Sequence, residues 1–214
     1  FGVMALFFLM PFAPTMALAG LTVFVCFSFG IKLLRGKRVF KFELLDLFVA
    51  VFAVMLFFGG FVSLSSGSIA PSLIFLCFIS CYFLTSCCIR SREWLIKFTT
   101  ATIFSALLVS FYGILQYVLG TTMNAAWIDT DLFEDIAGRA VATLENPNML
   151  GEYLILLIPM AASMWITGEG MSRKNSFCCF ACMTMCLILT WSRGAWIGML
   201  FALVAFIFMW SKRS

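Results

Sequence analysis

The sequence predicts an all-α protein, a polytopic bundle of transmembrane helices, from its composition, its hydropathy and the length of its apolar runs. Of its 214 residues, 63% are hydrophobic and only 11% are charged, whereas soluble domains carry about 25% charged residues. The mean hydropathy is +1.07, and a soluble chain of this length could not bury so much hydrocarbon. This composition argues against a soluble enzyme, a nucleic-acid-binding protein or a disulfide scaffold.

Long apolar runs in lipid must be helices, because the bilayer offers no partner for backbone amides. Seven runs are expected to cross the membrane, at residues 15–31, 44–62, 70–89, 98–119, 149–167, 177–191 and 195–210. Residues 1–10 are too short to cross, and Pro11 and Pro14 follow them and break a helix. We interpret residues 1–10 as the end of an earlier span; one long kinked helix is the alternative.

The chain begins at Phe1 within hydrophobic sequence and stops at Ser214 just after a span. We therefore expect a fragment of a longer polytopic protein, with residues 1–214 forming a single transmembrane domain. A catalytic loop and further spans are expected beyond its C-terminal end.

The basic residues predict the orientation of the chain. Seven alternating crossings place four connections on one side, and these connections hold 12 of the 14 Lys and Arg residues: 32–43, 90–97, 168–176 and 211–214. Positive residues concentrate on the cytoplasmic side. We therefore expect a multi-pass protein of the cytoplasmic membrane.

The longest outward connection is the segment at 120–148. Apolar residues at 128, 132, 133 and 136 recur at helical spacing and predict a short interfacial helix. The acidic residues of the segment are Asp129, Asp131, Glu134, Asp135 and Glu145. The acids at 129–135 admit a glycosidase-like carboxylate pair, but a solvated helix face is the favoured interpretation.

Two arginines, Arg139 and Arg193, are predicted to face outward, against the positive-inside pattern. Arg193 lies between two short spans, at or just below the membrane surface, where it needs an anionic partner. A guanidinium suits bidentate capture of phosphate or carboxylate oxygens. The alternative is an arginine that reaches the surface and pairs with a loop acid such as Glu145.

Asn146 before Pro147 is typical of an N-cap followed by proline at the first helical position. Such a helix start offers free amides and a positive dipole end to an anion. Asn148 and Glu152 are four residues apart, on one face; a hydrogen bond that anchors the start of the span is the alternative role. Together with the two arginines, this helix start would suit a polyanion such as pyrophosphate.

The nine cysteines lie mostly in apolar runs, and the chain has no His. Cys179 and Cys182 form a C-x-x-C, which we interpret as small buried residues rather than a metal or redox site. We therefore expect no metal and no cofactor. Gly194 and Gly198 form a G-x-x-x-G, which close packing within the subunit explains as well as dimerisation does.

Several motifs then carry a family resemblance. They are Gly-Arg at 138–139, Thr-Leu-Glu-Asn-Pro-Asn-Met-Leu-Gly at 143–151, Leu-Thr-Trp-Ser-Arg-Gly-Ala at 189–195, and Phe-Tyr-Gly-Ile-Leu-Gln-Tyr at 111–117. Together with the order of the spans, they resemble the O-antigen ligase and polymerase family of bacterial envelope glycan enzymes.

The resemblance implies a GT-C-like helical fold and a metal-independent, inverting glycosyltransferase of the bacterial inner membrane. Such enzymes take a glycan from undecaprenyl pyrophosphate at the outer face and pass it to a glycan or lipid acceptor, as in lipopolysaccharide or other envelope polysaccharide synthesis. Arg139 and Arg193 would bind the pyrophosphate, supported by Asn146, Asn148, Glu152 and Ser192. The implied partners are the donor, the acceptor and membrane lipids, with no nucleic acid.

The family is also expected to place a catalytic His in a large outer loop, which this chain lacks. The general base is therefore expected outside this fragment, which alone should be inactive. Two other functions stay open: a small-anion transporter or permease, and a non-catalytic membrane scaffold.

Overall fold

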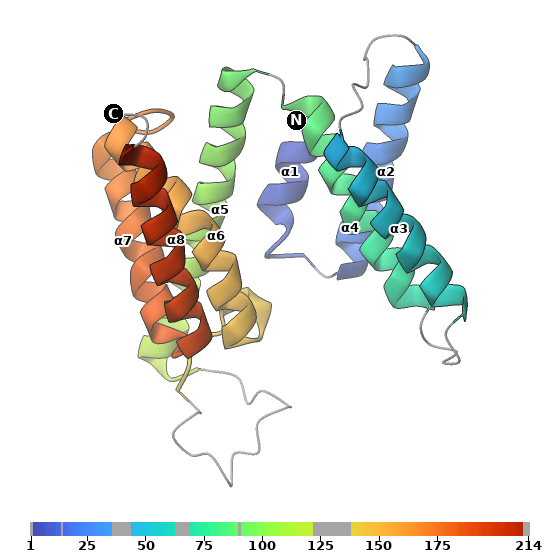
Figure 1. Cartoon of the computed structure of the whole chain (residues 1–214). Helices are drawn as coiled ribbons and strands as arrows, with labels where there is room; N and C mark the ends of the chain where they lie inside the picture. Colours follow the sequence, from blue (N-terminus) through green and yellow to red (C-terminus); the bar gives the residue numbers. More distant parts are fainter. Residues whose placement is uncertain are drawn as a thin grey trace, which may run out of the picture. The chain divides into compact units, whose positions relative to one another are not determined.

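The computed structural model describes residues 2–13, 15–35, 44–62, 69–89, 91–121 and 138–211, and these residues form an all-α structure. The helices are α1 (Gly2–Leu9), α2 (Thr15–Leu34), α3 (Leu44–Val62), α4 (Ile69–Cys88), α5 (Arg92–Leu119), α6 (Pro147–Thr167), α7 (Arg173–Leu189) and α8 (Arg193–Ser211), with a short 3₁₀ helix, η2 (Ala142–Leu144), before α6 (Figure 1). The chain divides into two compact units, Phe1–Leu95 and Ile96–Ser214. The single transmembrane domain expected from the sequence stays a prediction.

Each of the seven predicted apolar runs forms a helix, which confirms the all-α class. The largest difference in their limits is at α5, which begins at Arg92 rather than at residue 98. The alternative of one long kinked helix at the start of the chain is wrong. The amides of Phe12 and Ala13 both donate to the carbonyl of Leu9, at 2.9 and 3.0 Å, and this turn separates α1 from α2 because Pro11 cannot continue a helix.

Four helices, α2, α4, α5 and α6, are long and apolar enough to cross a membrane. Helices α3 and α8 are apolar over the shorter stretches Leu44–Gly60 and Arg193–Met209. The chain therefore has the features of a multi-pass membrane protein.

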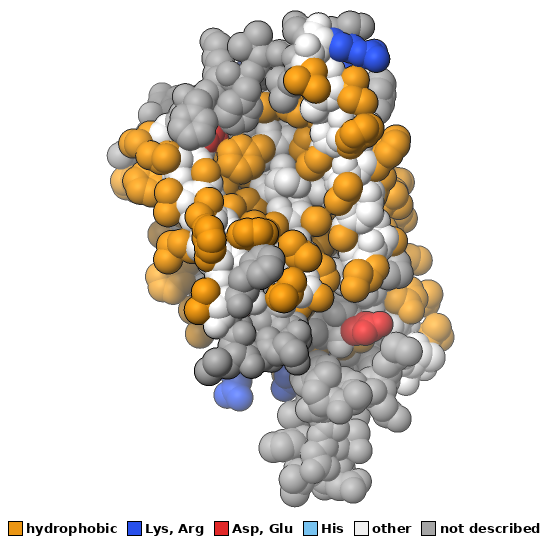
Figure 2. All heavy atoms as spheres, turned by 90° about the vertical axis from the view of Figure 1, so that its right-hand side faces the viewer, with side chains coloured by type: hydrophobic (Ala, Val, Ile, Leu, Met, Phe, Trp, Pro, Cys, Tyr) orange, Lys and Arg blue, Asp and Glu red, His pale blue; other side chains and the backbone are white. Residues whose placement is uncertain are grey.

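Large hydrophobic side chains are exposed along these helices, in the reverse of the soluble pattern. Phe24 and Phe27 of α2 and Phe48 and Phe52 of α3 are all more than half exposed. Figure 2 shows hydrophobic side chains over much of the described helix surface that it draws. Contiguous apolar surface of this kind suits contact with lipid.

In the first unit, α4 packs against α1, α2 and α3. Asp46 in the first turn of α3 is only 3% exposed, and its carboxylate accepts a hydrogen bond of 2.9 Å from the hydroxyl of Tyr82 on α4. A buried carboxylate is costly without such partners, so this contact fixes the side of α3 that faces α4.

In the second unit, α6 packs against both α7 and α8. Its fully buried Leu150, Leu154 and Ile158 form the centre of an apolar core that also includes side chains from α5, α7 and α8. This shared core packs α5, α6, α7 and α8 against one another.

Two close approaches define the direction of the helices in this unit. A methyl group added at Gly170, in the turn after α6, would lie 2.9 Å from Cγ2 of Ile96 near the start of α5. One added at Gly113, near the end of α5, would lie 3.0 Å from Sγ of Cys186 near the end of α7. Helix α5 is therefore antiparallel to α6, and one end of the unit gathers the end of α7 and the starts of α6 and α8.

Candidate functional site

The candidate site lies at that end and begins with the tight turn between α7 and α8. The Thr190 hydroxyl donates to the carbonyl of Leu187 at 2.7 Å and accepts from the amide of Ser192 at 3.3 Å. Trp191 has a φ of 51°, a left-handed conformation that is uncommon for a bulky residue. These contacts reverse the chain within three residues and bring Arg193 to the first position of α8.

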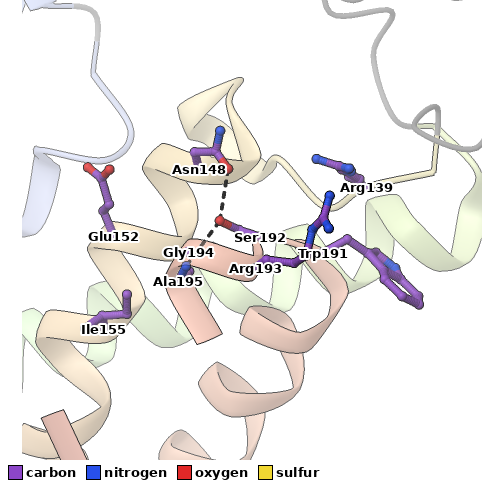
Figure 3. Close-up of a pocket in the computed structure, with 9 residues that line it drawn as sticks. All are labelled: Arg139, Asn148, Glu152, Ile155, Trp191, Ser192, Arg193, Gly194 and Ala195. Carbon is purple, nitrogen blue, oxygen red and sulfur yellow. Dashed lines mark hydrogen bonds between the residues drawn. The ribbon is translucent and has the colours of Figure 1, made fainter. Parts of the chain in front are cut away.

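Ser192 connects this turn to the start of α6. Its hydroxyl donates to Oδ1 of Asn148 at 2.9 Å and accepts from the amide of Ala195 at 3.4 Å (Figure 3). The side chain therefore caps α8 in the way favoured for Ser and joins two helices whose starts are far apart in sequence.

Gly151 allows α6 and α8 to approach closely beside this bond. A methyl group added at Gly151 would lie 2.6 Å from Cβ of Ala195, well inside van der Waals contact. The small residues at both positions therefore set the spacing between the two helices.

Asn146 is the N-cap of α6 and Pro147 is the first helical residue, as the sequence predicted. Its Oδ1 accepts from the amides of Asn148 and Met149, at 2.8 and 3.4 Å. The amide of Leu150 bonds to the carbonyl of Asn146, and Pro147 has no N–H.

The expectation that this helix start offers free amides to an anion is therefore wrong. The cap and the proline occupy or remove the N–H groups that would have bound it. At the start of α6, the groups that could still bind an anion are therefore side chains.

A backbone hydrogen bond of the neighbouring Ala140 positions Arg139 at the site. Ala140 is fully buried, and its amide donates to the carbonyl of Leu189 at 2.9 Å. This bond satisfies a carbonyl at the C-terminal end of α7, where helices leave such groups without a partner. It also holds the half-buried Arg139 beside the turn that carries Arg193.

These contacts surround an open hollow of about 580 Å³, within the roughly 300–1,000 Å³ range of small-molecule sites. Its lining residues are Arg139, Asn148, Glu152, Ile155, Trp191, Ser192, Arg193, Gly194 and Ala195. Five of the six predicted site residues are thus brought together, and Asn146 acts as the cap behind them. In the view of Figure 3, both guanidinium groups lie on one side of the Ser192 hydroxyl and the Glu152 carboxylate lies on the other.

Neither arginine has an ion-pair partner among the described residues. Arg193 does not pair with Glu145, the alternative considered from the sequence. Glu152 lines the same hollow but pairs with neither guanidinium. Two cations bordering one open hollow repel each other, so a bound anion of two or more charges would relieve an unfavourable interaction.

Four lining residues, Ile155, Trp191, Gly194 and Ala195, were missed by sequence reasoning. Trp191 and Trp196 lie with ring centroids 6.0 Å apart, and Trp191 is exposed. Tryptophan at the end of an apolar run is typical of a membrane–water interface, and this signal could have indicated a residue at the edge of the site.

The two glycines of the G-x-x-x-G in α8 have different surroundings. Gly198 packs toward α6, since an added methyl would lie 3.1 Å from Cδ1 of Ile155, whereas Gly194 faces open space. The G-x-x-x-G therefore serves packing within the chain at one of its two positions.

Cys179 is buried and Cys182 partly buried, and both are free thiols. No group of three or more residues of metal-binding type occurs in the described part of the chain.

The acidic cluster at 129–135 and the interfacial helix expected there lie outside the described residues. Comparison of the chain with models of protein families, with curated proteins and with solved structures gave no match.

Proposed function

We propose that this chain is part of a membrane glycosyltransferase of the O-antigen ligase or polymerase type. It would transfer or polymerise a glycan carried on undecaprenyl pyrophosphate, at the outer face of the bacterial cytoplasmic membrane. The observation that carries the proposal is the meeting of Arg139 and Arg193 at one hollow, from segments more than fifty residues apart in sequence. The resemblance of the motifs around both arginines supports the same activity.

The chemistry follows from the charge of the leaving group. The acceptor hydroxyl would attack the anomeric carbon of the donor sugar, and the bond from that carbon to the diphosphate oxygen would break. Negative charge then grows on the departing diphosphate, and preplaced guanidinium groups stabilise it without a metal ion. The proton of the acceptor would pass to a general base that the resemblance assigns to a segment outside this chain.

The proposal includes seven membrane crossings and a GT-C-like arrangement of the helices. Within the second unit, Lys97 near the start of α5 and Arg173 and Lys174 at the start of α7 belong to the end opposite Arg139 and Arg193. This separation agrees with an inner, cytoplasmic end rich in cations and an outer end that carries the two arginines.

The test is arginine replacement in the complete protein in its own membrane. Arg193→Ala and Arg139→Ala should each lower transfer of glycan from the lipid-linked donor by a factor of about 10²–10³, as losses of transition-state donors do. Arg193→Lys should rescue only part of this loss because a lysine cannot form a bidentate contact.

Lys174→Ala is the matched control, since it removes an exposed cation from the other end of the same unit. It should leave glycan transfer unchanged at equal expression. Full activity of both arginine variants would contradict the proposal.

The second candidate function is a small-anion permease, which the open cationic hollow also suits. Flux of a labelled anion into liposomes that hold the protein, lost with Arg193→Ala and present without any lipid-linked donor, would favour it. Retained function in an Arg139→Ala, Arg193→Ala double variant would instead favour a non-catalytic scaffold.

A further inference from the structure

The hollow has a second polar end, formed by one face of α6. Asn148 and Glu152 are one helical turn apart, and both line the hollow. In Figure 3 their side chains project from α6, with the Ser192 hydroxyl between the Glu152 carboxylate and the two guanidinium groups. The site is therefore dipolar, with cations at one end, the Glu152 carboxylate at the other and the Asn148 amide beside Ser192 between them (Figure 3).

The hydrogen-bonding capacity of this end is defined by the contact with Ser192. Oδ1 of Asn148 accepts from the Ser192 hydroxyl at 2.9 Å, which leaves Nδ2 as a donor with no partner in the described ranges. Glu152 is exposed and has no partner in these ranges either. When it is ionised, its carboxylate accepts hydrogen bonds and donates none. A donor and an acceptor thus lie one helical turn apart on α6.

The charge of Glu152 determines what can bind beside it. A carboxylate repels a phosphate, so an anion held by Arg139 and Arg193 would not also occupy the Glu152 end. A group that donates hydrogen bonds is needed there instead. Neighbouring hydroxyls of a sugar ring both donate and accept, which complements an amide and a carboxylate. A bare diphosphate cannot supply such donors.

We propose that Asn148 and Glu152 bind neighbouring hydroxyls of the sugar that is attached to the diphosphate. The hollow then recognises a glycosyl diphosphate as one unit, with the diphosphate at the arginines and the first sugar over the first turns of α6. This inference rests on the proposed function, because it takes the arginines to hold the diphosphate. It adds the residues that distinguish the lipid diphosphate that carries a sugar from the bare lipid diphosphate left after transfer.

The test compares the binding of two kinds of lipid to the purified protein in nanodiscs. One is undecaprenyl diphosphate, and the other is a set of the same lipid bearing one glucose, galactose or N-acetylglucosamine. At least one glycosylated lipid should bind about tenfold more tightly than the bare lipid, as hydrogen bonds to a charged group allow.

Glu152→Ala should abolish this preference while binding of the bare lipid stays equal or becomes tighter, since a negative charge is removed. Asn148→Asp keeps the acceptor for Ser192 but loses the amide donor, and it should reduce the preference. Glu169→Ala is the matched control, because it removes a carboxylate just beyond the other end of α6. It should preserve the preference.

The outcomes separate the two proposals. Two outcomes overturn only the assignment of Asn148 and Glu152 and leave the proposed function standing. In the first, binding depends on the arginines but no glycosylated lipid is preferred. In the second, the preference survives Glu152→Ala. An equal weakening of both kinds of lipid by Glu152→Ala overturns this assignment as well. If the bare lipid does not bind, or binds independently of Arg193, the proposed function and this inference both fail.

Discussion

At the scale of single residues, Gly151 is a position beside the site where the structure leaves no room for a larger side chain. An added methyl would lie 2.6 Å from Cβ of Ala195, and neither atom can rotate away because both are fixed to helix backbones. We predict that Gly151→Ala lowers the free energy of unfolding by about 1–3 kcal/mol, the usual cost of overpacking. The measurement is thermal unfolding of the purified protein in detergent.

The matched control is Gly194→Ala, since an added methyl there meets nothing within 4 Å. It should leave the midpoint of unfolding unchanged or raise it, because alanine favours helix more than glycine does. Equal midpoints for wild type and Gly151→Ala would show that α6 and α8 are not in close contact at Gly151 and Ala195.

The residues of the site differ in how far the sequence could predict them. Arg193 and Ser192 adjoin a short turn between two apolar runs, so their place at a helix start follows from the pattern. The place of Arg139 depends on one backbone hydrogen bond between Ala140 and Leu189. The pattern of apolar and polar residues in the sequence gives no sign of such a contact. The approach of Gly151 to Ala195 is likewise a property of packed helices, which single-sequence patterns do not contain.

At the scale of elements, the start of α6 depends on its cap. Oδ1 of Asn146 satisfies the amide of Asn148 at 2.8 Å, and Asn148 in turn holds Ser192. We predict that Asn146→Ala lowers the free energy of unfolding by about 1 kcal/mol, with Asn146→Asp close to wild type. Thermal unfolding of the same preparation measures both.

Asn175→Ala is the control for this change, because Asn175 also lies in the first turn of a helix but bonds to Ser172 only through its backbone amide. It should unfold at the wild-type midpoint. A loss as large as that of Asn146→Ala would mean that polarity near the helix start, rather than the cap, provides the stability.

The elements themselves were the most predictable level. Long apolar runs bounded by Pro, Gly or charged residues are expected to form helices in lipid, because a helix satisfies its own backbone hydrogen bonds. The seven runs all form helices. The exact start of α5 was missed because Arg92, Glu93 and Lys97 are polar and end the apolar pattern, although they continue the helix. Hydropathy marks the part of a helix that lies in lipid, not the whole helix.

At the scale of the whole molecule, the two units differ in what they contribute. The predicted site residues that line the hollow all belong to the second unit. The first unit carries the buried contact of Asp46 with Tyr82 and broad exposed apolar faces on α2 and α3. The chemistry that we propose therefore belongs to a four-helix unit, whose contacts can be tested separately from those of the first unit.

The proposed topology depends most on α7. It has 17 residues and a length of about 26 Å, a little short of the ~30 Å hydrocarbon core. If α7 crosses, its ends lie at or slightly below the two surfaces, with Arg173 and Lys174 reaching the inner surface and Arg193 held just below the outer one. We predict that positions 174 and 194 are on opposite sides of the membrane.

Cysteine labelling checks this prediction in variants whose native cysteines are replaced. Gly194→Cys should react with a membrane-impermeant maleimide from the outside of intact cells, and Lys174→Cys should react only in inverted vesicles. Both positions are exposed, so the difference reports on sidedness rather than burial. Labelling of both from the same side would mean that α7 does not cross, and the turn that carries Arg193 could then not face a donor at the outer surface while the cations of α7 face the cytoplasm.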